Sequence, residues 1–279
     1  IEAGRSKIKI GYYLCMNTGG VVEEMHGEPT KDPAFGMPAI WVSEEDRAEA
    51  ERRGYAVVDP PTIIATHLTE IIRSHAAEIL GRQEVSAIIT KIKETNPVVV
   101  DEVLTTSKYT YGEIEKVLQG LLREQVSIRN IVAILETLAN YGSYTHDSRM
   151  LIEKVREALG LQICLQYVDA DRRLSVLQLS QSLSEKILQH TVVPKDGGEP
   201  FVAFDPVDGR KWISAVSSAL AQVREKNILP IILCAAEVRA LVRSSIDREM
   251  PGTVVLSINE VMAAGHNVSL EILGEIDVQ

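Results

Sequence analysis

Apolar residues recur with two different periods along the chain, and the change of period separates its regions. Up to about residue 59 the apolar runs are short and lie between glycines and prolines, which is typical of strands joined by loops. Strands are predicted at residues 8–14, 39–42 and 55–58. Ser43, followed by three acidic residues, predicts the start of a short charged helix that ends at Gly54.

From Thr62 to about Leu161 the apolar positions follow a helical period, which predicts five amphipathic helices. Asp59 is expected to cap the first helix, and Thr110 with Glu113 forms a capping box at the start of the third. Asn96-Pro97 interrupts the pattern, and the valine-rich segment 98–104 predicts a short strand. The expected core positions are Ile64, Leu68, Ile71, Ile72 and Ile79; Val85, Ile88, Ile89 and Ile92; Ile114, Val117, Leu118, Leu121 and Leu122; Ile131, Ile134, Leu135 and Leu138; and Leu151, Ile152, Val155 and Leu159.

Beyond Gly160 the pattern changes again. Alternating residues at 162–169 and 174–179 predict a hairpin, and the run Pro194–Pro200 is a loop. Strands at 230–234 and 253–258 enclose a helix, which predicts a parallel pair with a right-handed crossover. Further helices are expected at 184–190 and 212–223, and a last strand at 268–272.

These patterns predict a mixed α/β and α fold made of several small subdomains. The N-terminal unit is α+β with an inserted subdomain, the middle is helical and the C-terminal subdomain is α/β. The predicted divisions are residues 1–59 with 108–126, then 60–107, 127–207 and 208–279. A chain of small domains suits a protein that presents surfaces to partners, although multidomain enzymes share this organisation.

Charge and composition exclude several classes of protein. With 29 basic and 39 acidic residues the net charge is −10, which disfavours binding to nucleic acid. No run of apolar residues reaches the length of a membrane span. The opening segment, Ile1–Arg5, has neither a signal pattern nor an initiator methionine, so we expect the chain to be part of a longer protein.

Motifs for covalent chemistry are missing from the sequence. It has no phosphate-binding loop, nucleophile elbow or zinc-protease motif, and it predicts neither a cofactor nor a metal. Cys15, Cys164 and Cys234 are too far apart to suggest a disulfide framework, which indicates a reducing, cytosolic setting with buried thiols. The six histidines are scattered and are interpreted as surface or satisfied side chains. These residue patterns by themselves identify no particular reaction.

Several sequence segments resemble one known family. In the family's order and spacing these are Asp32–Trp41, Gly54–Pro60, Ala65–Leu68, Leu80–Glu84, Lys116–Glu124, Ser127–Arg129 and Ile134–Ala139. They are similar to the cytoplasmic part of the export-gate proteins of flagellar and type III secretion systems, the flagellum, hypersensitive-response and invasion protein export pore family. The match is strongest over about residues 30–160, and the flagellar branch fits better than the injectisome branch.

The resemblance implies a function in protein export. A member of this family has a membrane-embedded N-terminal half, lies on the cytoplasmic side of the bacterial inner membrane, and forms a ring of nine subunits. Its partners are flagellar export chaperones with bound substrates, the export ATPase complex and other export-gate membrane proteins. Its role is to bind these complexes and to contribute to substrate selection and gate control, so the resemblance also implies that the protein is not an enzyme.

The resemblance also implies positions for the chaperone-binding site, a hydrophobic depression between the first two subdomains. These positions are Ala77, Leu80, Val103, Lys108, Thr110 and Tyr111. This chain carries one extra residue around 106–112, has Leu80 where an aromatic residue is common, and has Thr105 in place of a usual proline. Leu80 and Val103 are open to a second interpretation as core residues, and Thr110 to one as a helix cap.

Ring assembly in the family uses mainly the third subdomain. Its charged residues Glu136, Arg149 and Arg156 are hypothesised to pair across subunits, from their location and sign alone. The alternative function is an α/β enzyme or small-ligand sensor whose site lies on the loop Pro194–Pro200 or at the crossover ends near Ala235 and Asn259.

Overall fold

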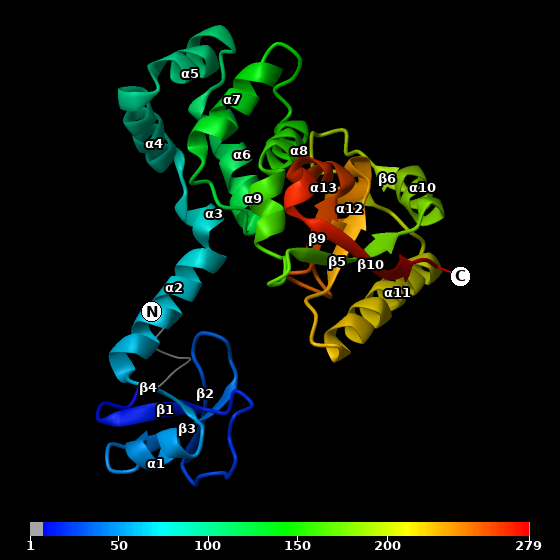
Figure 1. Cartoon of the computed structure of the whole chain (residues 1–279). Coiled ribbons are helices and arrows are strands. Elements are labelled where there is room, and N and C mark those ends of the chain that lie inside the picture. The colour runs from blue at the N-terminus through cyan, green and yellow to red at the C-terminus, as the bar shows by residue number, and fades with distance from the viewer. Residues whose placement is uncertain (1–7, 279) are drawn as a thin grey trace. The chain divides into compact units, whose positions relative to one another are not determined.

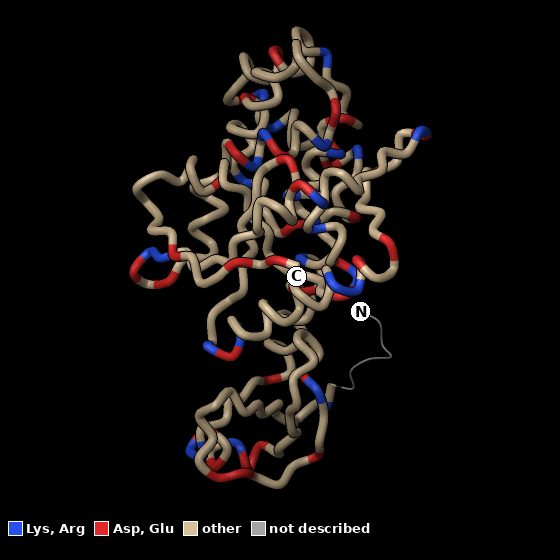
Figure 2. The backbone as a smooth tube through the Cα atoms, turned by 90° about the vertical axis from the view of Figure 1, so that its right-hand side faces the viewer, with Lys and Arg blue, Asp and Glu red and all other residues tan. Residues whose placement is uncertain are grey.

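The computed structural model describes residues 8–278, which divide into two compact units between Ile79 and Leu80 (Figure 1). The opening segment Ile1–Arg5 lies outside the described residues. Charged positions of both signs are intermingled along the backbone of both units, as Figure 2 shows.

The N-terminal unit is built on a four-stranded antiparallel sheet in the order β2-β3-β1-β4. Helix α1 covers one face through Ala50, which packs with Cys15 and Val42, while α2 covers the other by placing Ile63 against Leu14 and Trp41. The strands are β1 Tyr12–Met16, β2 Glu28–Lys31, β3 Pro38–Ser43 and β4 Ala56–Val58, and the helices are α1 Arg47–Arg52, α2 Pro60–Ser74 and α3 Ala76–Ile79.

In this unit one predicted helix cap is confirmed, and two other predictions about its helices are wrong. Asp59 caps α2 as predicted, accepting a hydrogen bond from the backbone N–H of Thr62 at 3.3 Å. The predicted start of α1 was wrong, because Ser43 is the last residue of β3 and Asp46 occupies the N-cap position. The predicted apolar face of α2 was also displaced: Ile63 is buried, whereas the expected core residue Ile64 is 40% exposed.

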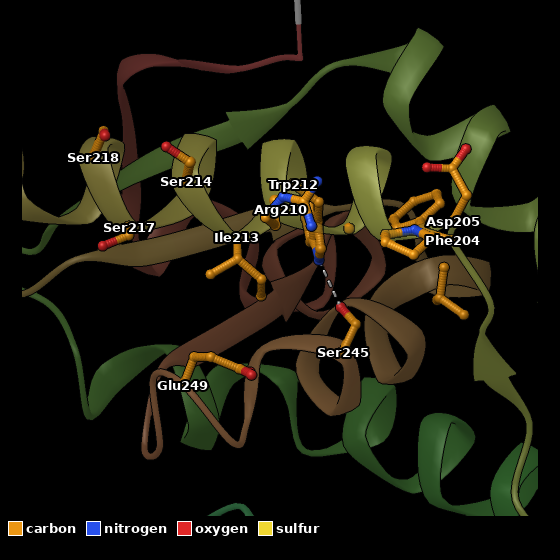
Figure 3. Close-up of a pocket in the computed structure, with 13 residues that line it drawn as sticks. Phe204, Asp205, Arg210, Trp212, Ile213, Ser214, Ser217, Ser218, Ser245 and Glu249 are labelled. Carbon is orange, nitrogen blue, oxygen red and sulfur yellow. Dashed lines mark hydrogen bonds between the residues drawn. The ribbon is translucent and has the colours of Figure 1, made fainter.

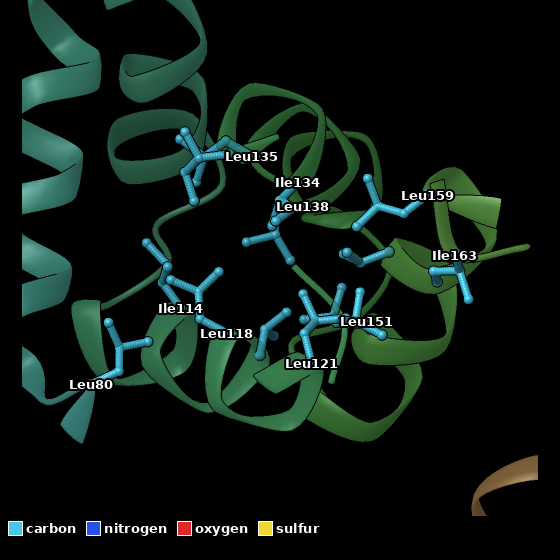
Figure 4. Close-up of a cluster of buried hydrophobic side chains, with 14 of the residues drawn as sticks. Leu80, Ile114, Leu118, Leu121, Ile134, Leu135, Leu138, Leu151, Leu159 and Ile163 are labelled. Carbon is cyan, nitrogen blue, oxygen red and sulfur yellow. The ribbon is translucent and has the colours of Figure 1, made fainter. Parts of the chain in front are cut away.

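The helices of the C-terminal unit enclose a large hydrophobic core. Leu118, Leu121, Ile134, Leu138 and Leu151 are fully buried within it, which confirms the predicted faces of three helices (Figure 4). These helices are α4 Arg82–Thr95, α5 Pro97–Asp101, the π-helix η1 Glu102–Thr106, α6 Tyr111–Arg123, α7 Ile131–Tyr141, α8 Ser148–Ala158 and α9 Gly160–Leu165.

A parallel sheet, in the order β10-β5-β8-β9, separates this helical core from a second one. Leu174 and Leu233 face the helical core, whereas Leu177 and Ile232 face a second core that contains Trp212. The remaining elements are β5 Arg173–Leu179, α10 Gln181–Gln189, β6 Thr191–Val192, β7 Phe201–Val202, α11 Pro206–Glu225, β8 Ile231–Cys234, α12 Ala236–Ile246, β9 Val254–Ser257, α13 Ile258–Ala264, the 3₁₀ helix η2 Gly265–Asn267 and β10 Ser269–Ile276.

Two predicted elements of this unit were wrong, and tertiary packing explains both. The segment 98–104 is helical, because Pro97 fits the first position of a helix and Val99, Val100 and Val103 are buried in the helical core. The predicted hairpin does not form. Its first half is α9, which buries Ile163 and Cys164, and its second half is β5, which pairs with β10 and β8, both far along the chain. The predicted parallel crossover between β8 and β9 is confirmed.

The parallel sheet also crosses a predicted subdomain boundary. Strand β5 lies in the predicted third subdomain, whereas its neighbours β8 and β10 belong to the predicted fourth. The boundary near residue 207 therefore does not separate two independent sheets, and the four-part division remains a prediction.

A cluster of buried ionic side chains joins the helical core to the α/β part of this unit. Arg239 on α12, only 1% exposed, forms a forked pair with Glu124 at the end of α6, with nitrogen–oxygen distances of 2.6 and 3.0 Å. It also donates to both carboxylate oxygens of Glu153 on α8. Arg156, one turn further along α8, contacts Glu124 at 3.3 Å and lies 2.6 Å from Glu260 of α13.

Each end of this cluster is held by backbone groups as well. Both arginines donate to the carbonyl of Val255 in β9, and one oxygen of Glu260 accepts from the backbone N–H of Ser257. The Nε of Arg156 and the nearer oxygen of Glu260 are in charge contact without the alignment of a hydrogen bond. Side chains from α6, α8, α12 and α13 thus meet in one buried polar network.

The network shifts the pKa values of Glu124 and Arg239. Burial by itself would raise the pKa of Glu124, but the neighbouring Arg239 and Arg156 lower it below its ordinary value. Burial would likewise lower the pKa of Arg239, and the attraction of Glu124 and Glu153 raises it instead. Because each charge depends on its partners, removing one member leaves the others buried and uncompensated.

We therefore expect Arg239→Met to reduce the free energy of unfolding by about 3–5 kcal/mol, because Glu124 and Glu153 lose their shared partner. Urea denaturation would measure this loss. The matched control is Lys91→Met, which removes an exposed pair with Glu94 and should change stability by less than about 0.5 kcal/mol. Equal effects of the two substitutions would show that the network is not stabilising the unit.

The lowered pKa of Glu124 also predicts a pH dependence. A carboxylate with a depressed folded-state pKa stabilises the fold above its unfolded pKa of about 4.3, and this contribution is lost as the pH falls through the folded-state value. Between about pH 5 and pH 3, the unfolding free energy of Glu124→Gln should therefore fall less steeply than that of the wild type. Identical slopes in urea denaturation would contradict this assignment.

Candidate functional site

The start of α6 carries two of the residues implied by the family resemblance, and it is a fully formed capping box. The hydroxyl of Thr110 accepts from the backbone N–H of Glu113 at 3.1 Å, and the carboxylate of Glu113 accepts from the backbone N–H of Thr110 at 2.8 Å. Two otherwise free amide groups are thereby satisfied, so this end of the helix is fixed. Thr110 remains exposed beside the half-buried Tyr111, so it can cap the helix and offer a surface at once.

The segment that leads into this capping box has an unusual backbone. A π-helix occupies Glu102–Thr106, and Lys108 follows in the left-handed region with φ 59°. A π-helical turn holds more residues than an α-helical turn, so it can absorb an additional residue without interrupting a helix. Lys108 is exposed, and the segment is anchored by the fully buried Val103 and by Tyr109, 3% exposed.

The structure divides the six residues implied by the resemblance into supporting and exposed positions. Val103 is fully buried and Leu80 is 8% exposed, and both belong to the helical core, which supports their interpretation as core residues. Leu80 is further held through its carbonyl, which accepts from the side chain of Gln119 at 2.8 Å. Lys108, Thr110 and Tyr111 remain available at the surface. Ala77 is buried in α3 of the N-terminal unit, while the other five belong to the C-terminal unit.

The three residues hypothesised to pair across subunits have different environments. Glu136 is exposed on α7. Arg149 is partly exposed and pairs with Asp147 at 3.0 Å, which raises its pKa. Arg156 is only 2% exposed, and its charge is satisfied by Glu124 and Glu260 inside the unit. The hypothesis for Arg156 is therefore corrected to a structural role, while Glu136 and Arg149 stay predictions.

A pocket of about 600 Å³ lies where the alternative function was expected. It is bounded by Glu199 and Pro200 of the predicted loop, by the start of α12 next to Ala235, and by Asn259. The start of α12 and Asn259 follow the carboxyl ends of β8 and β9, the edge of a parallel sheet at which ligands commonly bind, whereas Glu199 and Pro200 belong to the loop between β6 and β7. Arg149 lines the same pocket. The sequence indicated this location through its crossover pattern.

A second pocket, of about 820 Å³, lies along α11 and was not predicted (Figure 3). The ring of Trp212 forms part of its wall and donates through Nε1 to the hydroxyl of Ser245 at 3.0 Å. Phe204 and Ile213 add apolar surface, and Asp205 and Glu249 lie near its ends. The pattern of α11 predicted the buried Trp212, but nothing in that pattern indicated an opening beside it.

The environments of the cysteines match the sequence interpretation. All three are buried and free; burial raises the pKa of Cys15 and Cys164 to about 11 and that of Cys234 to about 12. They are therefore protonated at neutral pH and unreactive. Across residues 8–278, His, Cys, Asp and Glu side chains form no group of three or more arranged to hold a metal ion. Over the same range, every helix is too short or too polar to cross a membrane.

Comparison with known proteins connects this architecture to a family. The model of the FHIPEP family matches residues 1–265. The flagellar biosynthesis protein FlhA of Treponema pallidum is 42% identical over 282 residues, which cover 100% of this chain and 39% of that protein. FlhA of Bacillus subtilis is 37% identical over 277 residues, covering 99% of this chain and 40% of that protein. The chain thus spans about two fifths of the length of these relatives.

Solved structures with a similar fold are also found. The Chlamydia pneumoniae CdsV protein matches with a TM-score of 0.81 and 26% identity, over 98% of this chain and 76% of that one. A nonameric SctV-C from EPEC matches with a TM-score of 0.73 and 23% identity, over 96% of this chain and 79% of that one. The second likeness shows a shared fold, and together they confirm the mixed α/β architecture with a helical middle.

The capping box at the start of α6 predicts a specific change in stability. Thr110→Ala removes the hydroxyl that accepts from Glu113, and it should lower the free energy of unfolding by about 1 kcal/mol. Thr110→Ser keeps the hydroxyl and should stay within a few tenths of a kcal/mol of the wild type. Urea denaturation of the three proteins distinguishes them. If the two variants prove equally stable, the hydroxyl does not cap this helix.

Proposed function

The chain belongs to the FHIPEP family, and on that basis we propose that it is a cytoplasmic docking platform of the bacterial flagellar type III protein export apparatus. In this proposal it binds complexes of export chaperones with their substrates, and it contributes to substrate selection and gate control. The match of the family model to residues 1–265 is the observation that carries the proposal. The flagellar names of the relatives favour the flagellar system.

The geometry around the start of α6 supports this region as the docking surface. Thr110, Tyr111 and Lys108 lie next to one another on a segment whose backbone is fixed by a capping box and by the buried Tyr109. A rigid backbone loses little conformational entropy when a partner binds. Leu80 and Val103 act in this proposal as supports that hold the surface from below, because both are buried in the helical core.

The other partners follow from the same family membership. We propose assembly into a ring of nine, a state that the nonameric SctV-C structure shows for that protein, with Glu136 and Arg149 as contact residues between subunits. The export ATPase complex and the other membrane proteins of the export gate are proposed partners on the cytoplasmic side of the inner membrane. The role assigned here is binding without covalent catalysis.

A second candidate function is the binding of a small ligand at the carboxyl ends of β8 and β9. The observation that favours it is the pocket of about 600 Å³ lined by Ala236, Ser257 and Asn259. Ala236 and Asn259 lie in the first turns of α12 and α13, and Ser257 is the last residue of β9, where its hydroxyl accepts from the backbone N–H of Glu260. A ligand there would leave the start of α6 untouched, so the two functions can be tested separately.

Calorimetric titration tests the docking proposal directly. The chain is titrated with the flagellar export chaperones of its own organism, each alone and each loaded with its substrate. We expect Lys108→Glu to weaken binding of a loaded chaperone about tenfold, or about 1.4 kcal/mol, because it reverses an exposed charge within the docking surface. Lys116→Glu, at an exposed position of α6 outside that surface, changes the net charge equally and should leave binding unchanged.

Two results would contradict the proposal at different levels. Equal affinities of the two lysine variants would remove the docking surface from the start of α6. A folded wild-type chain that binds none of the chaperones would overturn the docking function itself and favour the small-ligand candidate. Substitution of Leu80 is a poor test, because a charge placed at this buried position would unfold its surroundings.

A further inference from the structure

The turn between α7 and α8, residues 142–147, lies directly against the segment that leads into α6. Gly142 approaches Ser107 so closely that a Cβ atom would come within 2.3 Å of the serine hydroxyl, which no side chain could occupy. Three residues further along, the carbonyl of Thr145 accepts from the phenol of Tyr109 at 3.1 Å. The turn and the candidate docking segment are therefore in contact at two separate points.

His146 provides a third connection. Its ring stacks on Tyr109 with centroids 4.2 Å apart and planes inclined by 20°. Its Nδ1 lies 2.9 Å from one oxygen of Glu113, whose other oxygen accepts from the backbone and hydroxyl of Thr110. Since Glu113 is an acceptor, Nδ1 must carry a hydrogen and donate it. One carboxylate thus holds both the start of α6 and the turn.

The turn itself is well ordered by its own hydrogen bonds, yet it exposes a large aromatic side chain. The backbone N–H groups of Tyr144 and Thr145 both donate to the carbonyl of Tyr141, at 2.9 and 3.0 Å, and the N–H of Asp147 donates to the hydroxyl of Thr145. Tyr144 nevertheless remains 82% exposed. Most of its ring is therefore in contact with solvent, although the backbone that carries it is fixed.

We propose that this turn is a second contact element of the docking surface, with Tyr144 as the residue that contacts the partner and His146 as a positioning residue. The proposed occupant is an apolar segment of the same chaperone–substrate complex that contacts Lys108 and Thr110, so the inference rests on the proposed function. Two features support it.

The first feature is continuity, because the turn is hydrogen-bonded to Tyr109, directly before Thr110, and to Glu113, which forms the capping box with Thr110. The second is the chemistry of the exposed side chain. Tyrosine is enriched among residues that dominate binding energy, since its ring buries a large apolar area while its hydroxyl accepts a polar partner. Because the turn is rigid, the tyrosine loses little conformational entropy when a partner binds.

The experiment is calorimetric titration of the chain with substrate-loaded flagellar export chaperones of its own organism. Tyr144→Ala should weaken binding about tenfold while its melting temperature stays that of the wild type, because the exposed ring adds little to the fold. The matched control is Met262→Ala, which removes another exposed apolar side chain, 73% exposed on α13, and should leave binding unchanged.

The positioning role of His146 has its own readout. His146→Ala should weaken binding, and His146→Asn should restore it, because the asparagine amide can donate from nearly the same place as Nδ1. The loss caused by His146→Ala should also be smaller when Tyr144 is already alanine, since His146 acts partly through that residue. Fully additive losses would show that His146 does not position Tyr144.

The outcomes separate this inference from the proposed function. If the wild type binds and Lys108→Glu weakens binding, but Tyr144→Ala binds like the wild type, the second contact element is refuted and the docking function stands. If the wild type binds no loaded chaperone, both fail together. If Tyr144→Ala and Met262→Ala weaken binding equally, the effect is not specific to the turn and the inference is refuted.

Discussion

The buried ionic network around Arg239 is the constraint on which the C-terminal unit depends. It is the buried polar contact between the helical core and the α/β part, which otherwise meet mainly through apolar packing on one face of the sheet. Arg239 and Arg156 are almost wholly removed from water, a position that is unfavourable for a cation unless each has carboxylate partners in good geometry. The arginines and their carboxylate partners come from four different helices, so the network is satisfied only when these helices take one relative arrangement. Apolar packing is less directional and would tolerate more than one arrangement.

Helix α6 connects this ionic network to the candidate docking surface. Glu124, at its C-terminal end, is held by the network, while Thr110 and Glu113 cap its N-terminal end. The helix between them is buried along one face through Ile114, Val117, Leu118 and Leu121. Both ends and one face are thereby fixed. The surface formed by Lys108, Thr110 and the turn at 142–147 is attached to a rigid element, which is the arrangement expected of a preorganised binding site.

Local signals in the sequence predicted much of this structure, and the errors have a common cause. The caps at Asp59 and Thr110, the apolar faces of α6, α7 and α8, and the parallel pair β8–β9 each depend on residues close together in the chain, or on a connection with only one favourable hand. The hairpin at 162–179 and the strand at 98–104 failed because long-range packing decided them. Val99, Val100 and Val103 are buried by helices, and β5 found its partners far along the sequence.

The candidate site, too, was predicted only in part from the sequence. Family resemblance indicated its positions, but only the structure separates the supporting Leu80 and Val103 from exposed residues, places Arg156 in the interior, and brings the turn that carries Tyr144 and His146 to the start of α6. A histidine and a tyrosine more than 30 residues from Thr110 carry no local pattern that would indicate this.

The most direct test of a docking platform at the start of α6 is the backbone amide hydrogen exchange of the chain, measured with and without a substrate-loaded flagellar export chaperone. The account predicts slower exchange in the bound state over residues 103–114 and 142–147, with no change at 236–241 and 257–259 around the pocket beside β8 and β9. Protection confined to that pocket, with the start of α6 exchanging as in the free chain, would contradict it.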